Sequence, residues 1–429
     1  MRHSRREIGL AKVFIAAFII LLLSASFSVK SFAGDARLSS GLRLINSRHR
    51  GETAAACLFI KTGYATEPAD KKGITSLLCN CVLSMNPVDS ANPPSLMIKR
   101  LGGKVTADVE SDYTCFKLES PADSFPAALK ALSEMVSGVN FSDDTVRIEK
   151  AAIAARNNFK TDNVVGRMYY AVFPAALPGD LKNISRKDLL AWRTARFAPG
   201  GALLSVCGPF SDKEVVKIAG FAFKSWPGSG KPYSREVQKP AFNAGKELEL
   251  ESEHGTAAVL FVFKLPPPGG SDYAAALTAR AMLAGGMSSM IYKSLRGKEP
   301  KAYQFGSSLE WASSAPVMTV YSVTDESRID DAVKRIKGSI GDLEDGKFSS
   351  SELERGEAFA SGGADFSLQS AVKTAWLSGM YEIAGAGNDY EKSLAGEISG
   401  VGSGDVSRAA RRYFRGYEIV TIRPGKEQK

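Results

Sequence analysis

The chain has 429 residues, of which 44% are hydrophobic and 24% are charged, and its formal net charge is +9. This length predicts two or three domains, and the composition is that of a globular protein with sizeable cores rather than a disordered one. No basic stripe interleaved with aromatic residues is present, so the mild positive charge does not indicate a nucleic-acid-binding protein.

The first 33 residues have the pattern of a secretory signal. Three arginines among the first six residues precede an apolar stretch from Val13 to Leu23, and small residues end at Ala33. We expect residues 1–33 to be a signal peptide, cleaved after Ala33, and the mature protein to be exported to the periplasm. The alternative is an uncleaved segment that anchors the chain to the inner membrane.

The remainder divides into two similar parts. Residues 227–246 are rich in Gly, Pro and charged residues and predict a linker between domains at 34–226 and 247–429. The strand-like runs TAAACLFIK (Thr53–Lys61) and TAAVLFVFK (Thr256–Lys264) begin corresponding passages, each followed by a helical pattern. Strands and helices alternate irregularly, which favours an α+β fold. We predict two homologous α/β-roll domains, each a mainly antiparallel sheet with helices packed on one face.

The pattern predicts further elements in chain order. In the first part we expect strands at 53–61 and 111–120, and helices at 73–85, 125–136 and 143–159. In the second part we expect strands at 256–264 and 316–324, and helices at 272–286, 329–343 and 350–363.

The helix at 73–85 contains the unusual pair Cys79 and Cys81. Residues two apart on a helix project to roughly opposite sides, so these thiols cannot chelate one metal ion together. Only His49 and His254 follow residue 33, which leaves a nucleophilic cysteine without an obvious base. We therefore interpret both cysteines as small buried apolar side chains. The pairing of the five cysteines stays open, although strand residues Cys57 and Cys115 could be neighbours.

The order of the motifs resembles that of the insulinase/pitrilysin zinc peptidases, inverted zincins that include the mitochondrial processing peptidases. The matching segments cover essentially all of the chain after residue 33. They are a strand ending in KTGYATEP, then LGGKVTADVESDYT (Leu101–Thr114), RFAPGGALLSVCGPFSDKEV, and LAGGMSSMIYKSLRGKEPKAY (Leu283–Tyr303). The resemblance implies a zinc motif, H-x-x-E-H, on the first long helix, with a third ligand, a glutamate, on a later helix.

This chain departs from that motif at every position. The motif positions hold Ser76, Cys79 and Asn80, and the third-ligand position, in EKAAIAAR, holds Arg156. A hydroxyl and an amide are poor zinc ligands, a guanidinium repels a dication, and one thiolate is fewer than the three or four protein ligands that zinc uses. The resemblance therefore implies that this chain has no catalytic residues and no metal or cofactor of its own.

The position of the Arg156 side chain can be predicted more specifically. We predict that its side chain occupies the vacated metal pocket, donating to Asn80 or Ser76 and pairing with Glu149, which lies seven residues earlier on the same helix. The alternative is a solvated arginine on a helix surface.

Arg296 and Tyr303 match the family's Arg/Tyr pair, which the resemblance assigns to substrate binding across the chamber. An arginine can hold a carbonyl or carboxylate, and a tyrosine hydroxyl can stabilise charge on the scissile carbonyl. The sequence differs from the family around them, with Pro300-Lys301 and Met290 at changed positions. The alternatives are a surface arginine and a core tyrosine.

In the family, some bacterial members occur as two similar chains, of which one carries the zinc motif and the other only the Arg/Tyr pair. The resemblance implies that this chain is the second kind, a non-catalytic, substrate-positioning subunit of an exported heterodimeric zinc metallopeptidase acting on peptides or unfolded proteins. Zinc is then expected in a homologous partner chain with an intact motif. The alternatives are a structural or peptide-binding pseudopeptidase with no role in proteolysis, and a self-sufficient enzyme with an unorthodox site.

Overall fold

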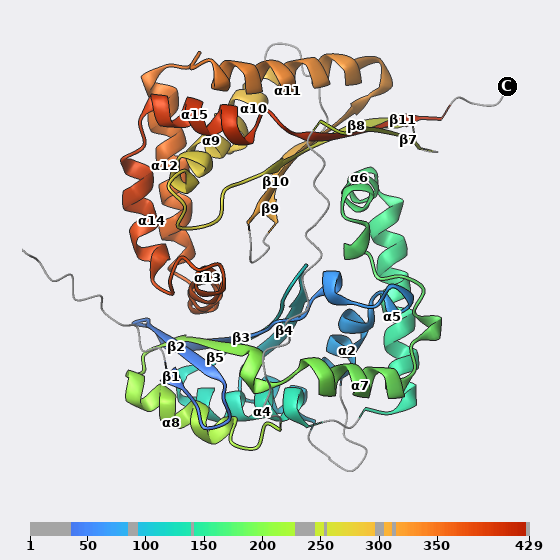
Figure 1. Ribbon diagram of the computed structural model, residues 1–429, viewed down its shortest axis with the longest axis vertical. Helices are drawn as coiled ribbons and strands as arrows, with labels where there is room; N and C mark the ends of the chain where they lie inside the picture. Colours follow the sequence, from blue (N-terminus) through green and yellow to red (C-terminus); the bar gives the residue numbers. More distant parts are fainter. Residues whose placement is uncertain are drawn as a thin grey trace, which may run out of the picture. The chain divides into compact units, whose positions relative to one another are not determined.

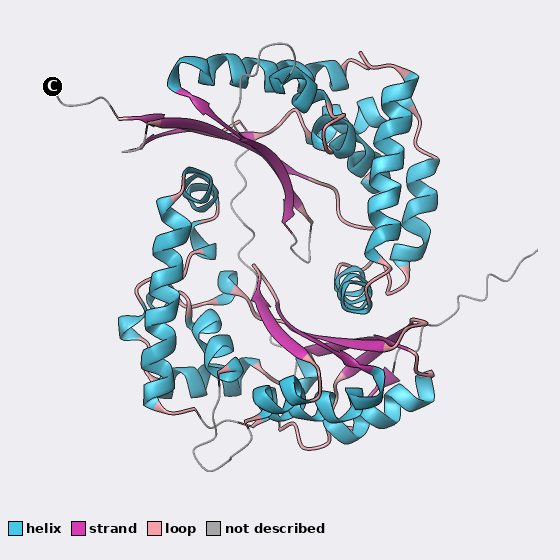
Figure 2. Ribbon diagram, turned by 180° about the vertical axis from the view of Figure 1, so that it is seen from behind, coloured by secondary structure: helices cyan, strands magenta, loops and turns pink. Residues whose placement is uncertain are grey.

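The computed structural model describes residues 36–84, 93–138, 141–227, 245–252, 255–296, 304–310 and 315–425. The expected signal peptide and most of the expected linker lie outside these ranges. Two sheets organise the described chain, each accompanied by helices, as Figures 1 and 2 show. We call residues 34–226 the first half and residues 247–429 the second half. Within the described ranges, no helix is both long and apolar enough to cross a lipid bilayer.

The first sheet has six strands in the spatial order β1-β2-β6-β3-β5-β4. All neighbouring strands are antiparallel except β2 and β6. The strands are β1 (Ala36–Arg37), β2 (Arg43–Arg48), β3 (Thr53–Ile60), β4 (Lys104–Val109), β5 (Thr114–Pro121) and β6 (Ala202–Gly208). The α-helices of this half are α2 (Ile74–Leu83), α3 (Pro94–Arg100), α4 (Phe125–Ser137), α5 (Asp143–Asp162), α6 (Val164–Val172), α7 (Arg186–Arg196) and α8 (Asp212–Ala222).

The second sheet has five strands in the order β7-β11-β8-β10-β9, and only β7 and β11 are parallel. The strands are β7 (Glu247–Ser252), β8 (Thr256–Lys264), β9 (Gln304–Glu310), β10 (Val317–Asp325) and β11 (Glu418–Pro424). The helices are α9 (Tyr273–Ala284), α10 (Met290–Arg296), α11 (Ile329–Glu344), α12 (Ser350–Ser367), α13 (Ala371–Ile383), α14 (Tyr390–Ser399) and α15 (Ser403–Tyr413). The predicted α+β class with mainly antiparallel sheets is confirmed.

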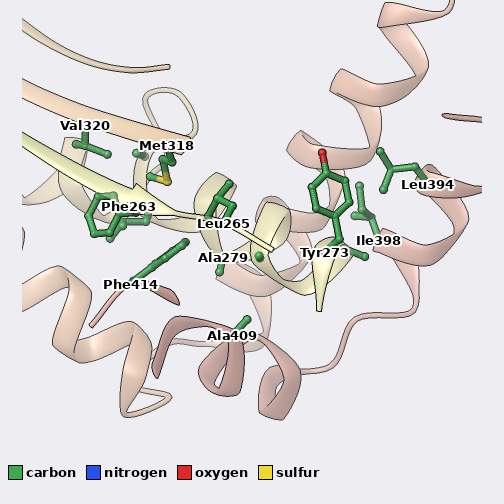
Figure 3. Packing of buried hydrophobic residues seen from close by; sticks show 14 of the residues in the cluster. Phe263, Leu265, Tyr273, Ala279, Met318, Val320, Leu394, Ile398, Ala409 and Phe414 are labelled. Atoms are coloured by element: carbon green, nitrogen blue, oxygen red, sulfur yellow. The ribbon is translucent and has the colours of Figure 1, made fainter. Parts of the chain in front are cut away.

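The core of the second half forms between its sheet and its helices. Phe263 of β8 packs against Phe414, with ring centroids 5.3 Å apart, while Tyr273 at the start of α9 is fully buried. Figure 3 shows these side chains with Leu265 and Ala409 in one apolar cluster. Small residues dominate α9, which allows the helix to be buried on nearly all sides.

Strand β3 is buried on both faces. We predicted helices on one face of the sheet, and the structure adds a helix against the other face of this strand. Its even-numbered residues, such as Leu58, belong to the core beneath the helices of the first half. Its odd-numbered residues, such as Phe59, pack with α13 of the second half. The Cys57 thiol is 3.7 Å from the carbonyl oxygen of Val372 in that helix. Burial on both faces explains why this antiparallel strand is continuously apolar instead of alternating.

Strand β8 shows the reciprocal arrangement. One face contributes Phe261 and Phe263 to the core of the second half, and the other contributes Leu260 and Val262 to a cluster with Met168 of α6. Helix α6 follows the long helix α5, just as α13 follows the long helix α12. Each half therefore places the corresponding helix against the sheet of the other half.

The start of α2 depends on a glycine and a buried carboxylate. Gly73 has φ +90°, a left-handed conformation that L side chains rarely adopt, and a Cβ there would lie 2.7 Å from Leu181 and Pro178 side-chain atoms. The Glu67 carboxylate, which is 4% exposed, accepts hydrogen bonds from the backbone N–H of Gly73 (2.7 Å) and Thr75 (2.9 Å). These bonds satisfy amides that the first helical turn leaves unpaired, and they fix the position of α2.

Candidate functional site: a degenerate metal pocket

A pocket of about 290 Å³ lies among α2, the edge strand β4 and the long helix α5. Its lining includes all four residues that the resemblance assigned to the degenerate metal site, namely Ser76, Cys79, Asn80 and Arg156. Ser76 and Asn80 are one helical turn apart on α2, and Arg156 comes from the facing helix α5. The structure therefore brings together positions that are 80 residues apart in sequence.

The residues in this pocket do not fit a zinc ion. Cys79 is only 2% exposed, and burial together with the nearby Glu67 raises the pKa of its thiol well above the usual range, so it stays protonated. The hydroxyl of Ser76 and the amide of Asn80 carry no charge, and Arg156 adds a cation. Within the described residues, no group of three or more His, Cys, Asp or Glu side chains is arranged to hold a metal ion.

Arg156 lines the pocket but does not make the predicted contacts. Its side chain is exposed, and its Nε donates to the carbonyl oxygen of Ala152, one turn back on α5, at 3.3 Å. Glu149 instead accepts a hydrogen bond from Ser84 at 2.5 Å. The predicted donation to Asn80 or Ser76 and the pairing with Glu149 were wrong, because a long side chain at the pocket mouth gains more from hydration than from burial.

Two carboxylates from different halves lie next to this pocket, and sequence reasoning missed them. Glu110 follows β4 and lines the pocket, while Glu310 ends β9 of the second half. The Tyr169 hydroxyl donates to Glu310 Oε2 at 3.3 Å. Burial, with Glu110 as the next cause, raises the pKa of Tyr64 to about 12. Nothing in the local sequence pairs these residues, because they meet only in the tertiary structure.

The Glu110 carboxyl group is held towards its neutral form. Burial raises its pKa to about 7, and the charges of Glu310, Asp108 and Asp112 act in the same direction. Lys117 opposes them, but this ammonium group also forms an ion pair with Asp108. A folded-state pKa above the unfolded value of 4.5 means that ionising Glu110 favours the unfolded chain.

Replacing Glu110 by glutamine should therefore change the pH dependence of stability. The contribution of Glu110 is fully present below pH 4.5 and is lost as the pH rises through about 7. We expect the free energy of unfolding of the wild type, relative to Glu110→Gln, to fall by about 2–3 kcal/mol over this range. Urea unfolding between pH 4.5 and 8 measures this, with Glu134→Gln on the exposed face of α4 as control. Parallel profiles for the wild type and Glu110→Gln would contradict the prediction.

Of the expected Arg/Tyr pair, only Arg296 lies within the described residues. Arg296 is the last residue of α10 and its side chain is exposed. Tyr303 lies outside the described residues, so its position relative to Arg296 stays a prediction. The next described residue is Gln304, the first of β9, and this strand ends at Glu310 beside the pocket.

All five cysteines are buried free thiols. Cys57 and Cys115, whose proximity the sequence left open, are neighbours across β3 and β5, and after burial itself the Cys57 side chain contributes to raising the pKa of Cys115. Burial also raises the pKa of Cys81 to about 12. Thiols held in this protonated state are poor nucleophiles, which agrees with the interpretation of Cys79 and Cys81 as small apolar side chains.

The fold and the pocket together define a class. The chain is a two-part α+β protein with a pocket between α2 and its facing helix α5, and Ser, Cys, Asn and Arg line this pocket at the positions where the resemblance implies a metal site. Residues 43–170 match the family model described as insulinase (peptidase family M16), and residues 183–358 match the peptidase M16 inactive domain. The chain belongs to the insulinase (M16) family.

Individual relatives agree with this assignment. The zinc protease PqqE of Helicobacter pylori is 21% identical over an alignment of 457 positions, which spans 98% of this chain and 99% of that protein. A protease structure from Helicobacter pylori has a TM-score of 0.83 at 18% identity and covers 91% of this chain and 99% of that one. A peptidase M16 inactive domain from Pseudomonas fluorescens has a TM-score of 0.81 at 16% identity, with coverages of 92% and 98%. These matches, with the pocket residues, support a non-catalytic member of the M16 family.

Proposed function

We propose that this chain is the non-catalytic, substrate-positioning subunit of an exported heterodimeric M16 zinc metallopeptidase that acts on peptides or unfolded proteins. The observation that supports the proposal is the pocket among α2, β4 and α5, which is lined by Ser76, Cys79, Asn80 and Arg156, the residues that the resemblance assigns to the metal-binding positions. The partner is a homologous chain with an intact H-x-x-E-H motif, which holds the zinc ion. Both chains reach the periplasm through signal segments such as residues 1–33.

The edge strand β4 is suited to hold an extended peptide. It pairs with β5 on one side and is the last strand of the first sheet within the described residues. After the exposed Lys104 its residues are half-buried, and Ala107, Asp108 and Val109 also line the pocket. An extended segment can add to such an edge through backbone hydrogen bonds, with its side chains entering the adjacent pocket. This arrangement supports binding without requiring chemistry in this chain.

Co-expression with the motif-bearing homologue tests the proposal. We expect the pair, but neither chain alone, to cleave unfolded peptides, and we expect a zinc chelator to abolish the activity. Arg296→Ala and Tyr303→Phe in this chain should lower the turnover of peptide by the pair while leaving assembly intact, because the losses concern substrate contacts rather than the fold. Arg408→Ala, at an exposed site on α15, is the matched control.

Other outcomes have definite meanings. Unchanged turnover in both Arg296→Ala and Tyr303→Phe would favour the structural or peptide-binding pseudopeptidase. Chelator-sensitive cleavage by this chain alone would overturn the proposal and indicate a self-sufficient enzyme. Failure of the two chains to associate during size-exclusion chromatography would remove the heterodimer from consideration.

A further inference from the structure

The second half contains its own pocket at the position that corresponds to the degenerate metal pocket. This pocket, of about 390 Å³, lies among α9, the edge strand β9 and the helices α12, α13 and α14. Helix α9 follows the central strand β8 just as α2 follows β3, and β9 ends its sheet just as β4 does. The long helix α12 faces α9 as α5 faces α2. We call this second cavity the α9–α12 pocket.

The walls of the α9–α12 pocket are mostly apolar and aromatic. Leu277 of α9 and Leu309 of β9 line it, together with the rings of Phe359 and Trp376. Phe359 is 49% exposed, and its ring lines the cavity. A concave apolar surface with a few polar groups is the usual form of a site for a small ligand or a ligand's terminal group.

Arg280 has a buried side-chain nitrogen without a hydrogen-bond partner in the described chain. It lies on α9, two turns after Tyr273, and lines the same pocket. Burial lowers the pKa of its guanidinium, and its buried Nε has no hydrogen-bond partner within the described chain. The structure also records no ion pair for this side chain with any described residue. Removing a cation from water without a counter-charge is strongly unfavourable, so an anion at this position would be stabilised.

A second cation lines the same pocket. Lys373 of α13 lines the pocket, and its ammonium group is 4.6 Å from the centroid of the Trp376 ring. Burial lowers the pKa of Lys373, and the neighbouring Lys117 acts in the same direction. Two partly desolvated cations beside aromatic rings attract an anion whose remaining part is apolar.

Glu391 of α14 also lines the pocket. It is 3% exposed, its Oε1 accepts a hydrogen bond from Ser378 at 2.8 Å, and its Oε2 has no partner in the described chain. Burial raises the pKa of this carboxyl group, which favours the protonated form. A protonated Oε2 can donate a hydrogen bond to a ligand oxygen in the pocket.

We propose that the α9–α12 pocket binds a carboxylate that carries an apolar group, and that its ligand is the C-terminal end of a peptide whose last residue is apolar. The planar fork of Arg280 suits a carboxylate, while Leu277, Phe359 and Trp376 surround the apolar side chain. The choice of a peptide rests on the proposed function, since a fatty acid presents the same chemistry. The pocket then anchors one end of a substrate or product whose extended part lies elsewhere on the chain.

Calorimetric titration of this chain alone tests the proposal with three probes. These are the peptide Gly-Ser-Gly-Ser-Leu with a free C-terminal carboxylate, the same peptide with a C-terminal amide, and octanoate. We expect the free-acid peptide to bind at least about tenfold more tightly than the amide, because a charge-assisted bond to Arg280 is lost in the amide. Octanoate is expected to bind more weakly than the free-acid peptide, whose backbone adds hydrogen bonds.

Variants connect the binding to the pocket. Arg280→Met keeps the length of the side chain and removes the charge, and we expect it to abolish the preference for the free acid. Because it removes a desolvated cation, this variant should melt at the same temperature as the wild type or higher, whereas a purely structural arginine would lower the melting temperature. Ala364→Leu, which fills the cavity from α12, should weaken binding of the free-acid peptide without touching Arg280. Arg408→Met, at an exposed site on α15, is the matched control.

Three results would overturn the proposal. Equal affinity for the acid and the amide, or an unchanged preference in both Arg280→Met and Ala364→Leu, excludes a carboxylate site at this pocket. Tight binding of octanoate without binding of the peptide excludes the peptide as ligand. The titration needs no partner chain, so failure of the heterodimeric peptidase in the turnover assay is distinguishable from failure of this site.

Discussion

Replacing Gly379 by alanine is expected to lower the free energy of unfolding by about 3 kcal/mol, because the new methyl group has no space. Gly379 lies within α13, and an added Cβ would be 2.1 Å from Cε2 of Phe59 and 2.7 Å from its Cζ. Phe59 is 2% exposed on β3 and packs against Tyr113 at a centroid distance of 5.7 Å, so its ring cannot move away easily. The contact joins a helix of the second half to the sheet of the first.

The matched control is Gly338→Ala on the exposed face of α11, where nothing lies within 4 Å of the added Cβ. This substitution should increase stability by about 0.5–1 kcal/mol, because alanine is the better helix former. Urea unfolding of both variants measures the difference. If the contact is the cause, Phe59→Leu should partly rescue Gly379→Ala by making room for the methyl group. A Gly379→Ala variant as stable as the wild type would show that α13 does not pack on β3 as described.

The strands and helices could be predicted well from local patterns, but their two-faced burial could not. The expected strand at 256–264 is β8 without any shift, and the expected helix at 125–136 is α4 with one additional residue. The continuous apolar sequence of β3 and β8 already contained a signal, since one-sided burial predicts alternation. Which element covers the second face is a non-local property. The short helices α6 and α13 serve this role, and no local pattern assigns them to a particular sheet.

The residues of the candidate site that belong to a motif could be predicted from the sequence. The residues that only tertiary contacts bring to the site could not. Landmarks along the chain located Ser76, Asn80 and Arg156, and the structure places them in one pocket. Glu110 and Arg280 carry no motif, so sequence reasoning passed over them. Arg280 left a weak local signal, because it is the charged residue inside the alanine-rich helix YAAALTARAMLA. A charge in a helix that is apolar on nearly every side indicates either a neutralising partner or a ligand.

The second large effect is expected from introducing into the first-half pocket the zinc-binding residues that the resemblance implies. The quadruple variant Ser76→His, Cys79→Glu, Asn80→His and Arg156→Glu places the family's residues at positions that already line one cavity. Without metal, this variant should be less stable than the wild type, because Cys79 is 2% exposed and a carboxylate there is desolvated. Each chain of the variant should bind one zinc ion, and this binding should raise the melting temperature, because zinc binds the folded form alone.

The triple variant that keeps Arg156 is the matched control, and its fixed cation should weaken zinc binding by at least about 100-fold, equivalent to about 2.7 kcal/mol. Metal analysis after dialysis and melting curves with and without chelator measure both effects, with the wild type expected to show no zinc-dependent shift. If the folded quadruple variant retains no zinc, the backbones of α2 and α5 do not hold the introduced side chains in a geometry that can bind the ion. Retention of zinc with a large rise in melting temperature would show that the change is confined to the side chains, since the backbone of α2, fixed by Glu67 at Gly73, still presents residues 76 and 80 to the pocket.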